Sequence, residues 1–204
     1  MKDLEELQEN GEKAIKATVK DVKSRAPSWI AQEVVNVYNI KKAEIIPSKN
    51  ETDDKKSKRA AKIKIQGEKI EDLKITYSGR LLTPVHFGMT PKTPPKGKNY
   101  TIKAEILKGQ KKTIGKYLTT KKRGGPYSDR SHNILMSTGA TSEGSTPYIP
   151  FQRMSKDRND IKKFTTLSVP QMLGNAQVSA AVIKRLNDET AKRLEHYIER
   201  YMNK

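Results

Sequence analysis

The amphipathic pattern near the end of the chain constrains its fold most. Asn175 follows a glycine and can cap a helix, because its side-chain oxygen can accept the unpaired amide groups of a first turn. Apolar residues then recur at multiples of three and four, at Val178, Val182, Leu186, Leu194, Ile198 and Tyr201. We expect a helix over 175–203. Its apolar stripe should pack against the rest of the protein or a neighbouring subunit, and it consists of Val178, Val182, Leu186, Leu194 and Ile198.

Residues 1–40 carry a second pattern of this kind. A single apolar stripe over residues 3–26 comprises Leu4, Leu7, Ala14, Ile15, Val19, Val22 and Ala26. Pro27 lacks the amide hydrogen that a helix interior needs, so the pattern predicts that this helix ends there. Ser28 can cap a following helix. We therefore expect an N-terminal helix pair.

Residues 41–170 instead show the two-residue alternation that is typical of strands. Tyr100, Ile102, Ala104 and Ile106 alternate with polar residues, and Gly109 lies in a turn, so 100–118 is predicted to be a hairpin. Weaker strand patterns occur at 63–65, 73–77, 148–153 and 161–167. Residues 48–60 and 119–147 are polar and aperiodic, and we expect mobile loops there.

Together these patterns predict an α+β fold. It has a small antiparallel sheet, an N-terminal helix pair, a long C-terminal amphipathic helix and long basic loops. A chain of 204 residues can form a core of ordinary size, and we expect one domain over 1–204. That domain has a helical N-terminus at 1–40, a strand-rich basic centre at 41–170 and the terminal helix at 175–203.

The composition limits the classes of function. No cysteine is present, which excludes a disulfide scaffold and a thiol nucleophile. No apolar run approaches the roughly 20 residues that cross a bilayer, and the first residues lack the apolar core of a signal peptide. We therefore expect neither a membrane-spanning segment nor Sec-dependent export. We also expect that the protein has no membrane partner.

The positive charge lies mainly in the middle of the chain. The net charge is +18, and residues 92–123 alone hold eleven basic residues against the single acid Glu105. Such a field attracts polyanions, so nucleic acid is the first partner to consider, and an acidic protein surface or an anionic membrane the next. Because lysine outnumbers arginine there and aromatic residues are not interleaved, neither base-specific reading nor single-strand stacking is favoured.

The strongest candidates for contact with a polyanion lie at the hairpin tip and in the loop that follows it. They are Lys111, Lys112, Lys121, Lys122 and Arg123. Side chains at a hairpin tip point away from the core and can reach DNA or an acidic neighbour. A solvated surface that keeps the chain soluble is the alternative.

The search for catalytic motifs gives no candidate. The histidines His86, His132 and His196 lack the spacing of metal ligands, and the adjacent acids Asp53–Asp54 and Glu71–Asp72 point apart. The segment Lys122–Gly125 lacks the spacing of a phosphate-binding loop. We predict no enzyme activity, no catalytic residue, no metal and no cofactor.

Several short phrases, in order along the chain, form a recognisable set. Near the N-terminus the phrase is Arg25-Ala26-Pro27-Ser28-Trp29-Ile30, followed by Val34–Ile40 and a pair of lysines. Further along are Phe151-Gln152-Arg153, the basic segment Arg158–Lys163, Ser168-Val169-Pro170-Gln171-Met172 and the helix Val178–Tyr201. Together these phrases resemble the phage minor tail protein Z family, the tail completion proteins. The lysine-rich loops at 48–60 and 119–147 depart from the family pattern.

The resemblance implies a structural virion protein of a long-tailed phage or prophage. Such a protein completes the tail at its head-proximal end, helps to join tail to head, and forms part of a ring around the DNA channel with other tail and neck proteins. It would be made in the host cytoplasm and reside in the virion. A free-standing accessory protein that binds DNA without sequence specificity is the alternative.

Overall fold

A computed structural model describes residues 2–46, 61–117, 134–138, 147–154 and 160–202. The chain forms two compact units, one comprising Met1–Val35, Lys42–Arg80 and Val169–Lys204, the other Asn36–Lys41 and Leu81–Ser168. We call them the helical unit and the strand unit. That they make up one domain stays a prediction.

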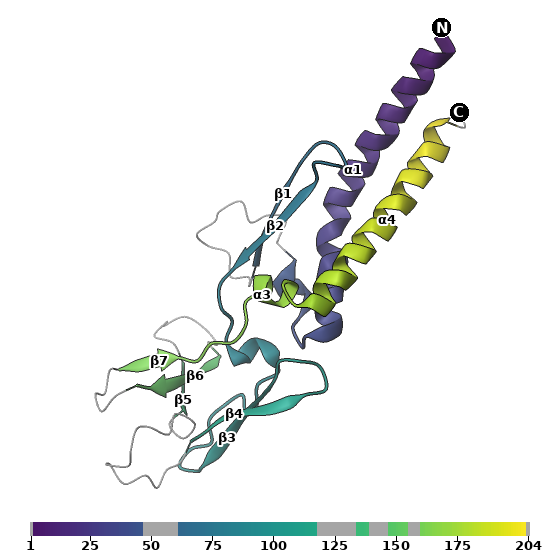
Figure 1. Cartoon of the computed structure of the whole chain (residues 1–204). Helices are drawn as coiled ribbons and strands as arrows, with labels where there is room; N and C mark the ends of the chain where they lie inside the picture. Colours follow the sequence, from purple (N-terminus) through teal and green to yellow (C-terminus); the bar gives the residue numbers. More distant parts are fainter. Residues whose placement is uncertain (1, 47–60, 118–133, 139–146, 155–159, 203–204) are drawn as a thin grey trace. The chain divides into compact units, whose positions relative to one another are not determined.

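Two long helices dominate the helical unit. Helix α1 (Lys2–Val37) and helix α4 (Ala176–Met202) run side by side in opposite directions, so that the start of α1 and the end of α4 lie at the same end of the unit (Figure 1). The short helices α2 (Lys42–Ile45) and α3 (Val169–Leu173) and the antiparallel pair β1 (Ala61–Gln66) and β2 (Lys74–Gly79) complete it. The predicted cap of the last helix is present, since Asn175 Oδ1 accepts hydrogen bonds from the amides of Gln177 and Val178 at 3.0 and 3.4 Å.

The predicted break at Pro27 is wrong. Helix α1 runs through it without interruption, and Ser28 is therefore an interior residue and not a cap. Proline removes one backbone hydrogen bond from a helix interior, which is a local cost. Ala26 and Ile30, on either side of it, are buried in the core of the unit, and this packing outweighs the lost bond.

The core of the helical unit lies where α1, α4 and β2 meet. Val22, Ala26 and Ile30 of α1 are almost completely buried there. Around them pack Trp29, Leu73, Ile75, Tyr77, Leu173, Val182 and Leu186. The stripe of alternating residues in β2 therefore faces α1, as the two-residue period of a strand requires.

The predicted stripe of α4 does not lie on one face. Its members are spaced by four residues or multiples of four, and each step of four advances about 40° beyond a full turn. Val178 is fully buried and Val182 and Leu186 pack against the core, whereas Leu194 is partly buried and Ile198 is 40% exposed. The far end of the stripe has rotated away from α1.

The described residues of the strand unit form two small antiparallel sheets and a short helix. One sheet pairs β3 (Tyr100–Glu105) with β4 (Lys111–Tyr117), which confirms the predicted hairpin. The other has the order β5 (Ile134–Thr138), β6 (Tyr148–Arg153), β7 (Ile161–Lys163). The 3₁₀ helix η1 (Pro84–Phe87) contacts both sheets.

Strand β5 corrects the prediction of one uninterrupted loop over 119–147. Ile134 and Met136 are buried in the core of the strand unit together with Met89 and Ile102. Two buried side chains separated by one residue place the segment in a sheet, where its backbone pairs with β6. The rest of that predicted loop, and the predicted loop 48–60, lie outside the described residues.

The described helices and antiparallel sheets confirm the α+β prediction. The helix pair expected at the N-terminus is one helix before the short α2, and the expected single sheet is divided into three.

Candidate interaction surfaces

A β-bulge in the hairpin determines which lysines share a face. Thr101 lies opposite Lys116 and Ile102 opposite Gly115, but Lys103 lies opposite Thr113, so Ile114 is an additional residue in β4. Lys111 and Lys116 are five residues apart and would point to opposite sides of a regular strand. The extra residue brings both to the same side.

The outer face of the hairpin is therefore basic. Residues directly opposite each other in a sheet share a face, and the pairs on this side are Thr101 with Lys116, Lys103 with Thr113, and Glu105 with Lys111. We call the set Thr101, Lys103, Lys111, Thr113 and Lys116 the basic strand face. All three of its lysines are exposed.

Glu105 is the acidic residue on this side, and it is engaged at the turn. Its Oε1 accepts a hydrogen bond of 2.8 Å from the amide of Gly109, whose φ of 74° lies in the left-handed region. The carboxylate thus holds the connection between the two strands. In the other two cross-strand pairs, Thr101 with Lys116 and Lys103 with Thr113, no acidic residue lies opposite the lysine.

The opposite face of the hairpin is the inner, apolar one. Ile102 and Ala104 are buried there, and the rings of Tyr100 and Tyr117 stack with centroids 4.9 Å apart. The Tyr100 hydroxyl accepts a 3.2 Å hydrogen bond from the amide of Met136. Burial raises the pKa of Tyr100 above its ordinary value, and the hydrogen bond from Met136 opposes this shift. The tyrosines of the hairpin are therefore part of its packing.

The five basic residues predicted from the sequence are not one cluster in the described structure. Lys111 belongs to the basic strand face, whereas Lys112, which is also exposed, lies opposite Ala104 and so belongs to the other side of the hairpin. Lys121, Lys122 and Arg123 lie outside the described residues. Sequence reasoning missed Lys103 and Lys116, because the bulge that aligns them has no clear signature in the sequence.

A second surface lies at the free end of α1. Leu4 and Leu7 are 72% and 55% exposed, although they continue the stripe that is buried further along the helix at Ala14 and Val22. Glu5, Glu6 and Glu9 are exposed on the other sides of this segment. An amphipathic helix end that leaves its apolar side uncovered is typical of a contact with another chain.

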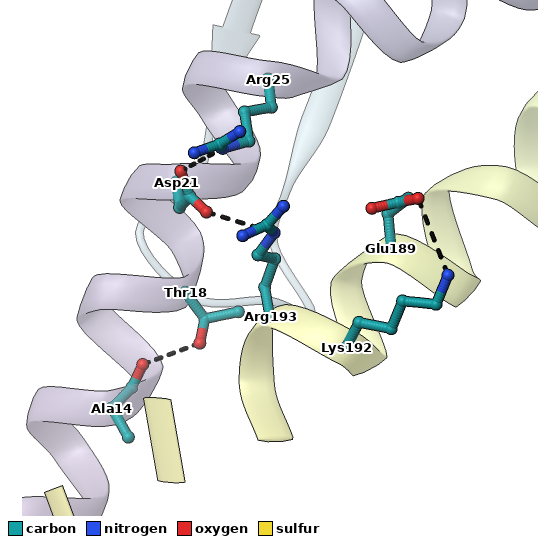
Figure 2. A network of polar contacts seen from close by, with 7 residues as sticks. All are labelled: Ala14, Thr18, Asp21, Arg25, Glu189, Lys192 and Arg193. Carbon is teal, nitrogen blue, oxygen red and sulfur yellow. Dashed lines mark hydrogen bonds and ion pairs between the residues drawn. The ribbon is translucent and has the colours of Figure 1, made fainter. Parts of the chain in front are cut away.

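Ion pairs fix α4 against α1. Asp21 Oδ1 accepts a 2.7 Å hydrogen bond from Arg25 Nε, and its Oδ2 lies 3.4 Å from Arg193 Nε of α4 (Figure 2). The hydrogen bond with Asp21 raises the pKa of Arg25. A second pair joins Glu33 to Arg185 at 2.5 Å, so the two helices are held at two points along their length.

A groove of about 850 Å³ lies between α1 and the β1–β2 connection. Its walls combine apolar groups with charges of both signs, from Glu12, Ile15, Lys16, Val19, Lys20, Lys23 and residues 68–71. This mixture favours no single class of ligand.

The described residues contain no group of three His, Asp or Glu side chains that could hold a metal ion. His86 lies in η1, and His196 is exposed on α4 beside Tyr197; His132 is outside the described residues. Over the described ranges no helix has both the length and the apolar character to span a membrane.

Comparison with known proteins gives no match: no family model, no curated protein and no solved structure is similar to this chain.

Proposed function

We propose that the chain is a structural virion protein of a long-tailed phage or prophage, which completes the tail at its head-proximal end and helps to join tail and head. In this proposal it is a subunit of a ring around the DNA channel, in contact with other tail and neck proteins. Its place is the neck of the virion, after synthesis in the host cytoplasm.

The observation that carries this proposal is the ordered set of phrases that resemble the tail completion family. In the structure, the phrase Ser168–Met172 spans the start and body of α3, where Val169 and Met172 are fully buried. The phrase Arg25–Ile30 lies on the buried part of α1, and Phe151–Arg153 lies in β6. The phrases on which the resemblance rests therefore fall on residues that build the two units.

The two surfaces support the same proposal. A ring subunit needs contacts with its neighbours, and the uncovered apolar side of Leu4 and Leu7 is suited to such a contact. Positive charge with little base specificity suits a channel that DNA crosses without being read. Lysines on an exposed strand face supply that charge.

A free-standing accessory protein that binds DNA non-specifically is the second candidate. The exposed lysines of the hairpin favour it directly, whereas the exposed leucines do not. Mass in solution discriminates between the two: a ring subunit assembles with itself or with tail components, and an accessory protein shifts on duplex DNA as a monomer or dimer.

The test of the proposal is deletion of the gene in the phage or prophage that carries it. We expect lysates with filled heads and separate tails in electron micrographs, and recovery of plaque formation when purified protein is added to the lysate. Normal titre and joined particles after deletion would contradict a role in tail completion.

A further inference from the structure

We propose that the basic strand face binds the phosphate backbone of duplex DNA. This inference rests on the proposed function, because it identifies the part of a neck subunit that meets the DNA. The residues are Lys103, Lys111 and Lys116, with Thr101 and Thr113 between them.

The arrangement of these side chains suits a phosphate backbone. Each of the three cross-strand pairs has one lysine on the outer side. Successive pairs lie about 7 Å apart along the strands, which is twice the rise of a residue. Each ammonium group is a mobile point charge on a long stem, which attracts a phosphate without fixed geometry. The threonine hydroxyls can donate hydrogen bonds to the same oxygens.

The bulge is the feature that creates this face. Without Ile114 as an additional residue, Lys116 would turn to the inner side of the hairpin, beside the core. In the observed register the three lysines share a face with the threonines, and the nearby Glu105 bonds to the turn.

The face is suited to a duplex more than to single-stranded nucleic acid. Binding of single strands relies on exposed aromatic rings on which bases stack. The tyrosines of this hairpin, Tyr100 and Tyr117, stack on each other on the inner side. The face also has lysine and no arginine, so it lacks the planar groups that recognise guanine through two hydrogen bonds.

The experiment measures binding of the full chain to a 30-base-pair duplex of mixed sequence by fluorescence anisotropy over a series of salt concentrations. The test variant is Lys103→Gln/Lys111→Gln/Lys116→Gln. Its matched control is Lys74→Gln/Lys162→Gln/Lys163→Gln, which removes the same charge from exposed positions of β2 and β7.

The slope of log affinity against log salt is negative, and we expect the test variant to reduce its magnitude by about 2 to 3, since each phosphate contact contributes about 0.9. Affinity at about 0.1 M salt should fall at least tenfold, whereas the control should change the slope by less than about 1. The corresponding triple arginine variant should bind as the wild type does. If the triple glutamine variant fails to fold, the double variant Lys111→Gln/Lys116→Gln should reduce the magnitude of the salt-dependence slope by about 2.

Three results would overturn the proposal: no binding of the duplex by the wild type, an equal loss in the test and control variants, or displacement of the duplex by polyglutamate as effectively as by unlabelled duplex. The last result would assign the face to an acidic protein. A wild type that binds no duplex but restores plaque formation to the deletion lysate overturns this inference alone. A deletion without effect on titre overturns the proposed function instead.

Discussion

Aspartate substitutions at Leu186 and at Ile198 should distinguish the buried part of the α4 stripe from its exposed part. Leu186 packs against the cluster of Val22, Ala26 and Ile30, whereas Ile198 lies three helical turns further along and is 40% exposed. The sequence pattern treats the two residues as equivalent. The structure predicts that only the first is required for stability.

The cost follows from two contributions. Removing a leucine side chain from a partly buried site lowers the free energy of unfolding by about 1 to 2 kcal/mol, which is less than the value for a completely buried side chain. Placing a carboxylate there without a hydrogen-bond partner adds about 1 to 3 kcal/mol. We expect Leu186→Asp to lower the free energy of unfolding of the helical unit by about 3 kcal/mol, a large part of the roughly 5 to 15 kcal/mol of a typical domain. Ile198→Asp should cost about 1 kcal/mol or less.

The assay is urea denaturation followed by tryptophan fluorescence. Trp29 is the single tryptophan of the chain and packs in the same cluster, so its emission reports the helical unit specifically. With a slope of about 1 to 3 kcal/mol per molar urea, the midpoint of Leu186→Asp should fall by about 1 to 3 M. Equal midpoints for Leu186→Asp and Ile198→Asp would refute the assignment of the two faces.

Three further predictions concern the helical unit. Gly67→Ala should destabilise it by about 2 kcal/mol or more in the same urea assay, because the residue has φ of 105° and a Cβ atom there would clash with the carbonyl oxygen of Asp72; an unchanged midpoint would contradict this geometry. Tyr77→Phe should be neutral or stabilising, because the Tyr77 hydroxyl is buried and bonds to none of the described residues. Burial also raises the pKa of Tyr77, so the unfolded chain loses this proton first, and the free energy of unfolding falls as pH rises through the pKa of the unfolded tyrosine, near 10; melting between about pH 9 and 11 should show a smaller alkaline loss for Tyr77→Phe than for the wild type. A double-mutant cycle with Glu33→Ala and Arg185→Ala should give a coupling energy of about 0.5 to 1 kcal/mol, as their side chains are partly exposed, and no coupling would mean that this pair does not hold α4 to α1.

The sequence pattern predicted those elements whose formation depends on local periodicity. The terminal helix with its cap at Asn175 and the hairpin over 100–118 are present as expected. Each carries a complete signal within its own residues, an apolar period with a cap in one case and an alternation with a turn in the other. The α+β class follows from these elements alone.

Strand β5 and the passage of α1 through Pro27 depended on the tertiary structure. Residues 134–138 are too few to show a period within a polar segment, and they form a strand because β6 pairs with them and the core accepts Ile134 and Met136. Proline by itself favours a break in a helix. Helix α1 nevertheless continues through Pro27, because residues before and after it are buried in the core.

The candidate surfaces show the same division. The sequence by itself determined that the centre of the chain is basic and that lysines lie at the hairpin, since charge is a property of composition. Which lysines share one face was decided by the fold. The single extra residue at the bulge turns Lys116 to the side of Lys103 and Lys111 and leaves Lys112 on the other side. Because side chains alternate along a strand, an insertion of one residue exchanges the faces, and only the pairing of two strands shows where it occurs.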